Sequence, residues 1–138
     1  MRADDITREA LADLREQIYQ AVQTLQKLPD REAALLRSGE RCAWPAIIVN
    51  YWEAYGQQRA KARPSPPTAG EIDAMERVLG WLTWLGRQDR EVMRCVFLCC
   101  GQGKTATEAG HILRLHRNTV RLKRDDGLAR ISRLARAT

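Results

Sequence analysis

Residues 105–124, TATEAGHILRLHRNTVRLKR, constrain the fold more than any other stretch of the chain. They begin with a capping box, Thr105-Ala-Thr-Glu108, in which the threonine side chain caps a new helix and the glutamate reaches back to the cap. A short helix to about Leu113, a tight turn at 114–116 and a long helix from Arg117 to about Arg136 are expected to follow. The stretch therefore predicts a helix-turn-helix.

The composition of this stretch suits the packing of two crossed helices. The first helix needs a small residue where the second crosses it, and Ala109-Gly110 supplies it. The apolar residues expected to hold the pair together are Ile112, Leu113, Leu115 and Val120. One departure is Arg114, which stands in the turn where glycine is common; a positive φ strains arginine more than glycine.

Two further helices are predicted in the N-terminal part. From Thr7 to Leu28, apolar residues recur every three or four positions, which is the stripe of an amphipathic helix. That stripe would serve either as core or as a surface for a homo-oligomer. Another helix opens at Trp44-Pro45, since proline is tolerated in a first turn, and ends at Gly56.

Two helices are expected between residue 68 and the helix-turn-helix. Thr68-Ala-Gly-Glu71 is a second capping box, and the helix that it opens is predicted to stop at Gly86. Asp89 begins the next helix, which Gly101 ends and whose residues Val92, Met93, Cys95, Val96, Phe97, Cys99 and Cys100 are expected to be buried. Because no segment shows sustained alternation of period two, no sheet is predicted, and the fold class is all-α.

A basic, proline-rich segment, QQRAKARPSPPTAG, separates the two parts of the chain. It predicts an N-terminal helical region (1–57), a stiff linker (58–70) and a C-terminal helix-turn-helix domain (71–138). The linker serves either as a plain connector or as a basic arm that touches phosphates or a partner. A pair of helices alone would leave much apolar surface exposed, which favours packing of the two parts against each other.

Charge is concentrated at the C-terminal end. Residues 1–113 hold 15 Lys+Arg and 15 Asp+Glu, so the whole net charge of +6 resides in 114–138. A charge localised on one predicted helix beside a turn indicates a nucleic-acid contact surface. The alternative is a helical hairpin with a solvated basic face.

The recognition helix of a helix-turn-helix reads base edges with its N-terminal end. The residues expected there are Arg117, Asn118, Arg121, Leu122 and Asp125. Arginine can bind guanine through two hydrogen bonds, asparagine can do so with adenine, and leucine can touch a thymine methyl group. The residues expected to contact phosphates are Arg114, Thr119, Lys123 and Arg124. His116 is expected to cap the second helix or to face the DNA.

Residues 85–131 resemble region four of bacterial sigma factors. In that family a helix of the form R-E-V precedes the helix-turn-helix, and R-x-T-V opens the recognition helix. Residues 90–92 (REV) and 117–120 (RNTV) match these two patterns. Nothing in the chain resembles sigma region two, so it is not expected to melt a promoter alone.

A wider resemblance runs through WPAIIVNYWEAYG, RPSPP, IDAMERVLGWLTWL and the terminal helix-turn-helix. These segments look like a family of alphaproteobacterial and prophage proteins that includes activators of gene transfer agents. The resemblance implies a transcription regulator that binds double-stranded DNA and works with RNA polymerase, with a second activator as a further partner. The alternative is an adaptor or anti-termination factor that docks on RNA polymerase without reading bases.

Other chemistries have weaker support. Gly103-Lys104-Thr105 matches the end of a phosphate-binding loop, but the first glycine of that motif would fall at Leu98. Cys95-x3-Cys99 and His111-x4-His116 approach zinc-finger spacing, but such a site would replace the helix-turn-helix. We therefore predict no enzyme, no cofactor and no metal, with the thiols packed as small hydrophobes.

The tryptophans and the apolar runs predict core rather than pocket or membrane. Aromatic residues at helical spacing, here Trp44, Trp52, Trp81 and Trp84, are more often core than ligand pocket. No apolar run approaches the roughly 18–20 residues that span a bilayer, and the N-terminus has no apolar signal-peptide core. A cytoplasmic, nucleoid-associated protein is expected.

Overall fold

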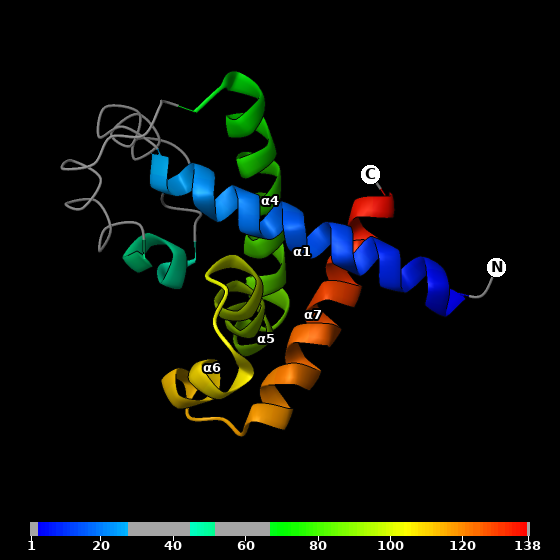
Figure 1. Cartoon of the computed structure of the whole chain (residues 1–138), viewed down its shortest axis with the longest axis vertical. Coiled ribbons are helices and arrows are strands. Elements are labelled where there is room, and N and C mark those ends of the chain that lie inside the picture. The colour runs from blue at the N-terminus through cyan, green and yellow to red at the C-terminus, as the bar shows by residue number, and fades with distance from the viewer. Residues whose placement is uncertain (1–2, 28–44, 52–66, 138) are drawn as a thin grey trace.

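The computed structural model describes residues 3–27, 45–51 and 67–137, and every regular element in these ranges is helical (Figure 1). This confirms the all-α prediction. The elements are α1 (Ala3–Lys27), a helix at 46–51, α4 (Ala69–Gln88), α5 (Arg90–Val96), the π-helical turn η2 (Phe97–Gly101), α6 (Ala106–Leu113) and α7 (Arg117–Ala137). The predicted linker lies largely outside the described residues, as do Trp44 and Trp52.

Helix α1 lies across α4 and α7 and also contacts η2 (Figure 1). It begins at Ala3, earlier than the predicted Thr7. Its apolar stripe is buried in the core of the same chain, at Leu14, Ile18, Val22 and Leu25. The N-terminal helix therefore shares one core with the C-terminal helices.

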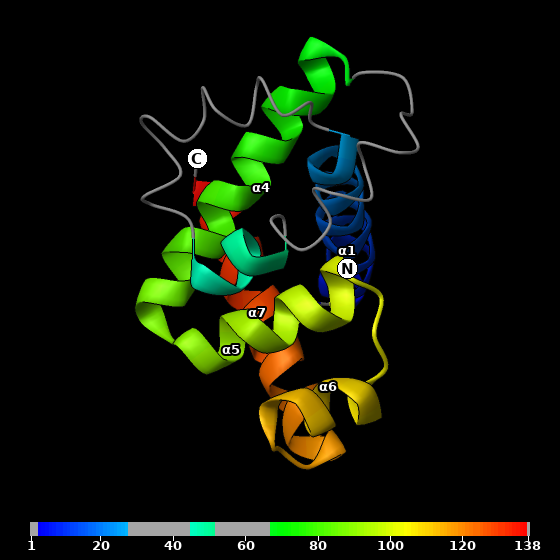
Figure 2. The same cartoon turned by 90° about the vertical axis from the view of Figure 1, so that its left-hand side faces the viewer.

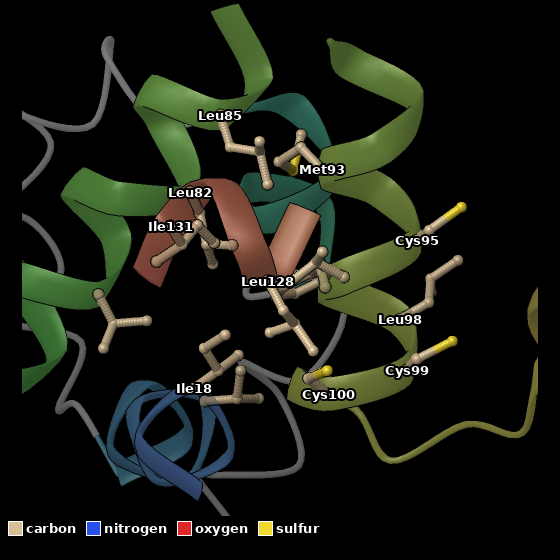
Figure 3. Packing of buried hydrophobic residues seen from close by; sticks show 14 of the residues in the cluster. Ile18, Leu82, Leu85, Met93, Cys95, Leu98, Cys99, Cys100, Leu128 and Ile131 are labelled. Atoms are coloured by element: carbon tan, nitrogen blue, oxygen red, sulfur yellow. The ribbon is translucent and has the colours of Figure 1, made fainter. Parts of the chain in front are cut away.

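The centre of that core lies between α1, α4 and α7 (Figure 3). Leu82 from α4, Ile131 from α7 and Ile18 from α1 converge there, and all three are fully buried. Trp81 and Trp84 are half-buried and pack against the same cluster, as expected for aromatic residues at helical spacing. The two halves of the described chain are thus held together by apolar burial.

The corner between α4 and α5 corrects one prediction. Helix α4 continues through Gly86 to Gln88, so the glycine does not end it. Asp89 ends α4 instead: its backbone N–H donates to the carbonyl of Leu85 while its carboxylate accepts from the N–H groups of Glu91 and Val92. One aspartate therefore closes one helix and caps the next, which is a stronger signal than a glycine.

The π-helical turn at the end of α5 was not predicted. It closes at Gly101, where an added Cβ would lie 2.9 Å from Val22 on α1, so the glycine permits the two segments to approach closely. Cys100 points from this turn toward the core, whereas Cys95 and Cys99 project from the opposite side of the ribbon (Figure 3). Burial raises the pKa of Cys95 and of Cys100 to about 11, so both remain protonated packing groups at neutral pH.

The described helices include none that is both long enough and apolar enough to cross a membrane. Each long helix instead carries an exposed polar side.

Candidate nucleic-acid interface

Helices α6 and α7 form a helix-turn-helix at one end of the molecule (Figure 2). Both bonds of the predicted capping box at α6 are present. The Glu108 N–H donates to the Thr105 hydroxyl at 3.1 Å, and the Thr105 N–H donates to the Glu108 carboxylate at 3.3 Å. The Thr105 N–H and the Thr105 hydroxyl, which lies 3.1 Å from the same carboxylate oxygen, both donate to the Glu108 carboxylate and hold its pKa below the usual value. The box at Thr68–Glu71 has the same two bonds, so both predicted boxes are confirmed.

The turn between the two helices depends on a close backbone approach. An added Cβ at Gly110 would lie 2.5 Å from the carbonyl oxygen of Leu115, so only glycine fits there. The amide of Leu115 donates to the Gly110 carbonyl at 2.9 Å. Gly110 is therefore needed, although the backbone of the turn at Leu115, rather than a crossing point of the second helix, is what leaves no room for a Cβ.

Arg114 adopts the left-handed conformation, with φ 58° and ψ 45°. It is the single non-glycine residue with positive φ in the described ranges. An L-residue with a Cβ is strained there. The departure noted in the sequence therefore corresponds to a strained turn whose exposed side chain carries a positive charge.

His116 caps helix α7. Its Nδ1 accepts the N–H of Asn118 at 3.1 Å, and its carbonyl accepts the N–H of Val120 at 3.0 Å. The capping role expected for this histidine is present, and its side chain is exposed beside the first turn of α7.

The exposed face of the first half of α7 brings together the residues predicted to read bases. Their positions follow the repeat of the helix, so they form one strip on the side opposite the buried Val120. We call it the outer strip. It consists of Arg117, Asn118, Arg121, Leu122 and Asp125, all of which are exposed. Leu122 is 72% exposed, which is unusual for leucine and leaves its side chain free to touch a partner.

The four predicted phosphate-contacting residues do not share one environment. Arg114 is exposed, and Thr119 is half-buried. The Lys123 ammonium lies 2.9 Å from the Glu91 carboxylate on α5, which raises the pKa of the lysine. Arg124 is also half-buried, and its Nε donates to Asp125 at 3.1 Å. Lys123 and Arg124 thus lie at the edge between α7 and its neighbours rather than on the outer strip.

One residue predicted to hold the two helices together does not do so. Ile112 is 52% exposed, so its assignment to the contact between the helices is wrong. Leu113 and Leu115 pack against the core and Val120 is fully buried, as predicted. The buried face of α6 is formed by Ala106, Ala109, Gly110 and Leu113, and Ile112 lies outside that face.

The second half of α7 packs against α5 through a contact that was not predicted from the sequence. Gly127 is buried, and an added Cβ would lie 2.5 Å from Val96 and 2.8 Å from Val92. Helix α7 therefore packs almost directly on α5, and a side chain larger than hydrogen would separate them. A glycine within a helix interior, where it costs stability relative to alanine, was the available signal.

Among the described side chains, no group of three or more His, Cys, Asp or Glu residues is arranged to hold a metal ion. Cys95 and Cys99 are buried in the core, whereas His111 is exposed on α6. The four residues at zinc-finger spacing therefore have different environments.

Comparison with known proteins assigns the chain to a family. Residues 26–131, the greater part of the chain, match the model described as domain of unknown function (DUF6362), and the chain belongs to that family. No curated protein and no solved structure gives a significant match.

Proposed function

We propose that this member of the DUF6362 family is a regulator of transcription that binds double-stranded DNA through α6 and α7 and acts together with RNA polymerase. The N-terminal half of α7 enters the major groove, and the residues of its outer strip contact base edges. The resemblance to sigma region four and to activators of gene transfer agents favours activation of a phage-like or gene-transfer-agent cluster. A protein that binds DNA at the promoters of such a cluster is nucleoid-associated.

The observation that carries this proposal is the outer strip of α7. Its two arginines and its asparagine are exposed together at the N-terminal end of a helix that follows a tight turn. None of Arg117, Asn118 and Arg121 forms a side-chain ion pair or hydrogen bond with another described residue. These side chains are therefore available for the bidentate contacts that distinguish guanine and adenine from other bases.

The way α7 is held also supports direct contact with DNA. Gly127 packs on α5, and Leu128 and Ile131 are buried in the core, so the orientation of the outer strip is fixed by the body of the protein. A binding constellation on a rigid element can be held in register with the groove. Arg114 lies beside the strip and can anchor a phosphate.

The first test measures sequence-specific binding. The preferred duplex is selected from a random pool with the purified protein, and its affinity is measured by fluorescence anisotropy for wild type, Arg117→Ala and Arg121→Ala. Each variant is expected to lose about 1–3 kcal/mol at the selected duplex and much less on a scrambled duplex. Arg133→Ala removes an exposed arginine from the other end of the same helix and serves as the matched control. Unchanged specific affinity in both strip variants would show that the base contacts are assigned wrongly.

A second candidate function is that of an adaptor or anti-termination factor that docks on RNA polymerase and reads no bases. The exposed apolar side chains of Leu122 and Ile112 favour it, because exposed apolar groups on a helix-turn-helix suit a protein surface as well as DNA. The two candidates are separated by occupancy of the tagged protein across the genome of its host. Sharp peaks at a few promoters indicate a sequence-reading activator, whereas signal spread through transcribed genes indicates travel with polymerase.

A further inference from the structure

A hollow with a volume of about 370 Å³ lies between the helix at 46–51 and the corner where α4 meets α5. It is open on one side. The apolar part of its lining, here called the floor, is made by Pro45, Ile47 and Met93, of which Met93 is buried, and Asn50 and Thr83 add polar groups. We call it the corner groove. Its volume lies near the lower end of the range for ligand-binding pockets.

The rim of the corner groove is strongly basic. Arg87 at the end of α4 and Arg90 and Arg94 on α5 line it, and all three are exposed. Among the described residues, no carboxylate lines the groove and none forms an ion pair with any of the three arginines. Unpaired guanidinium groups above an apolar floor complement a segment that combines carboxylates with an apolar side chain.

Helix α5 separates the corner groove from the recognition helix. One side of α5 packs on α7, where Val92 and Val96 meet Gly127, and another side presents Met93 and the two rim arginines to the groove. In Figure 1 the helix at 46–51 lies to the left of α5 and α7 lies to its right. A partner in the groove therefore leaves the outer strip of α7 open to DNA.

We propose that the corner groove binds an acidic peptide segment of a partner protein, with an apolar side chain of that segment on the Met93 floor and its carboxylates on the three arginines. This inference deepens the proposed function and rests on it in one respect: if α7 holds DNA, the groove holds the protein that is to be recruited there. The binding of the peptide itself does not depend on DNA.

The test uses a short fluorescein-labelled peptide of Asp, Glu and Leu, and the same peptide with Asn and Gln in place of the acids. Fluorescence anisotropy with the full chain is expected to show saturable binding of the acidic peptide only. Arg90→Gln combined with Arg94→Gln is expected to weaken it about tenfold or more. The matched control is Arg133→Gln combined with Arg136→Gln, which removes the same charge from the end of α7 and is expected to leave binding unchanged.

A second variant tests the floor without changing any charge. The Cβ of a side chain at Gly86 would lie 3.4 Å from Met93 and 3.8 Å from Pro45, so Gly86→Leu fills the groove from an existing helix. It is expected to abolish peptide binding while the circular dichroism spectrum and the affinity for the selected duplex are retained. Equal binding of the acidic peptide to wild type and Gly86→Leu would overturn the proposal.

Two further outcomes would assign the groove to a different occupant. Displacement of the peptide by duplex DNA in the Arg117→Ala, Arg121→Ala background would make the groove a nucleic-acid contact. A change of sedimentation velocity in Gly86→Leu would make it a contact between two copies of the chain. Peptide affinity and duplex affinity are measured separately. A failure of the peptide-binding proposal can therefore be distinguished from a failure of the DNA-binding proposal.

Discussion

The two halves of α7 differ in how much of their surface is buried. Residues 117–126 carry the exposed strip, whereas residues 127–137 include Gly127, Leu128 and Ile131, which are buried against α4, α5 and α1. The two halves belong to one uninterrupted helix. Packing of the second half, together with the buried Val120 of the first half, therefore fixes the direction of the outer strip.

This contrast shows why the N-terminal helix matters for a surface that it does not form. Helix α1 packs on α4, α7 and η2, so it closes the core against which the second half of α7 is held. Damage to the buried half is expected to lower stability first and binding as a consequence. Damage to the exposed half is expected to lower binding alone.

The sharpest way to test the contrast is to make the same substitution in both halves. Leu128 is 1% exposed and Leu122 is 72% exposed. Leu128→Ala is expected to lower the free energy of unfolding by about 2–5 kcal/mol, because it removes buried methyl groups and leaves a cavity. Leu122→Ala is expected to change it by less than about 0.5 kcal/mol. Urea denaturation followed by circular dichroism measures both, and equal losses would contradict the assignment of the two halves.

A smaller effect is expected where α7 touches α5. Gly127→Ala places a methyl group within 3 Å of Val92 and Val96 and is expected to cost about 1–3 kcal/mol. The matched control is Gly80→Ala on α4, where a Cβ meets nothing within 4 Å. There alanine is expected to stabilise the helix by up to about 1 kcal/mol. Thermal denaturation midpoints that rise in both variants would mean that α7 does not pack closely on α5.

How far these features follow from sequence depends on how local their causes are. The two capping boxes, the need for Gly110 and the unusual position of Arg114 were predicted, because each involves residues at most a few positions apart. Which residues of α7 belong to the outer strip followed from helical periodicity alone, since the exposed positions repeat with the helix. Whether the strip reads bases stays a prediction.

The features that escaped prediction are long-range. The ion pair of Lys123 with Glu91 and the contact of Gly127 with Val96 join helices that are separated by α6, and no local pattern specifies them. The corner groove likewise combines the helix at 46–51 with α4 and α5. Gly86 was misread because α4 is ended by the cap at Asp89, three residues further on.

The smallest expected effect concerns the turn that joins α6 to the exposed half of α7. The left-handed conformation of Arg114 costs roughly 1–2 kcal/mol for a residue with a Cβ. Glycine removes that strain but adds freedom to the unfolded chain, worth about 0.5–1 kcal/mol, so Arg114→Gly is expected to stabilise the protein by up to about 1 kcal/mol. The same substitution at Arg77, an exposed position inside α4, is expected to destabilise it by about 1 kcal/mol.

Arg114→Gly is also expected to separate stability from binding. On the proposed function, the loss of this positive charge beside α7 is expected to remove one phosphate contact, to lower the salt dependence of duplex affinity by about one unit of slope and to weaken all sequences alike. Chemical denaturation and anisotropy titrations at several salt concentrations measure the two effects on one preparation. A variant that is more stable and binds duplex with the salt slope of wild type would show that Arg114 contacts no phosphate. The arginine would then have to serve a partner other than DNA, because its strained turn is more stable with glycine.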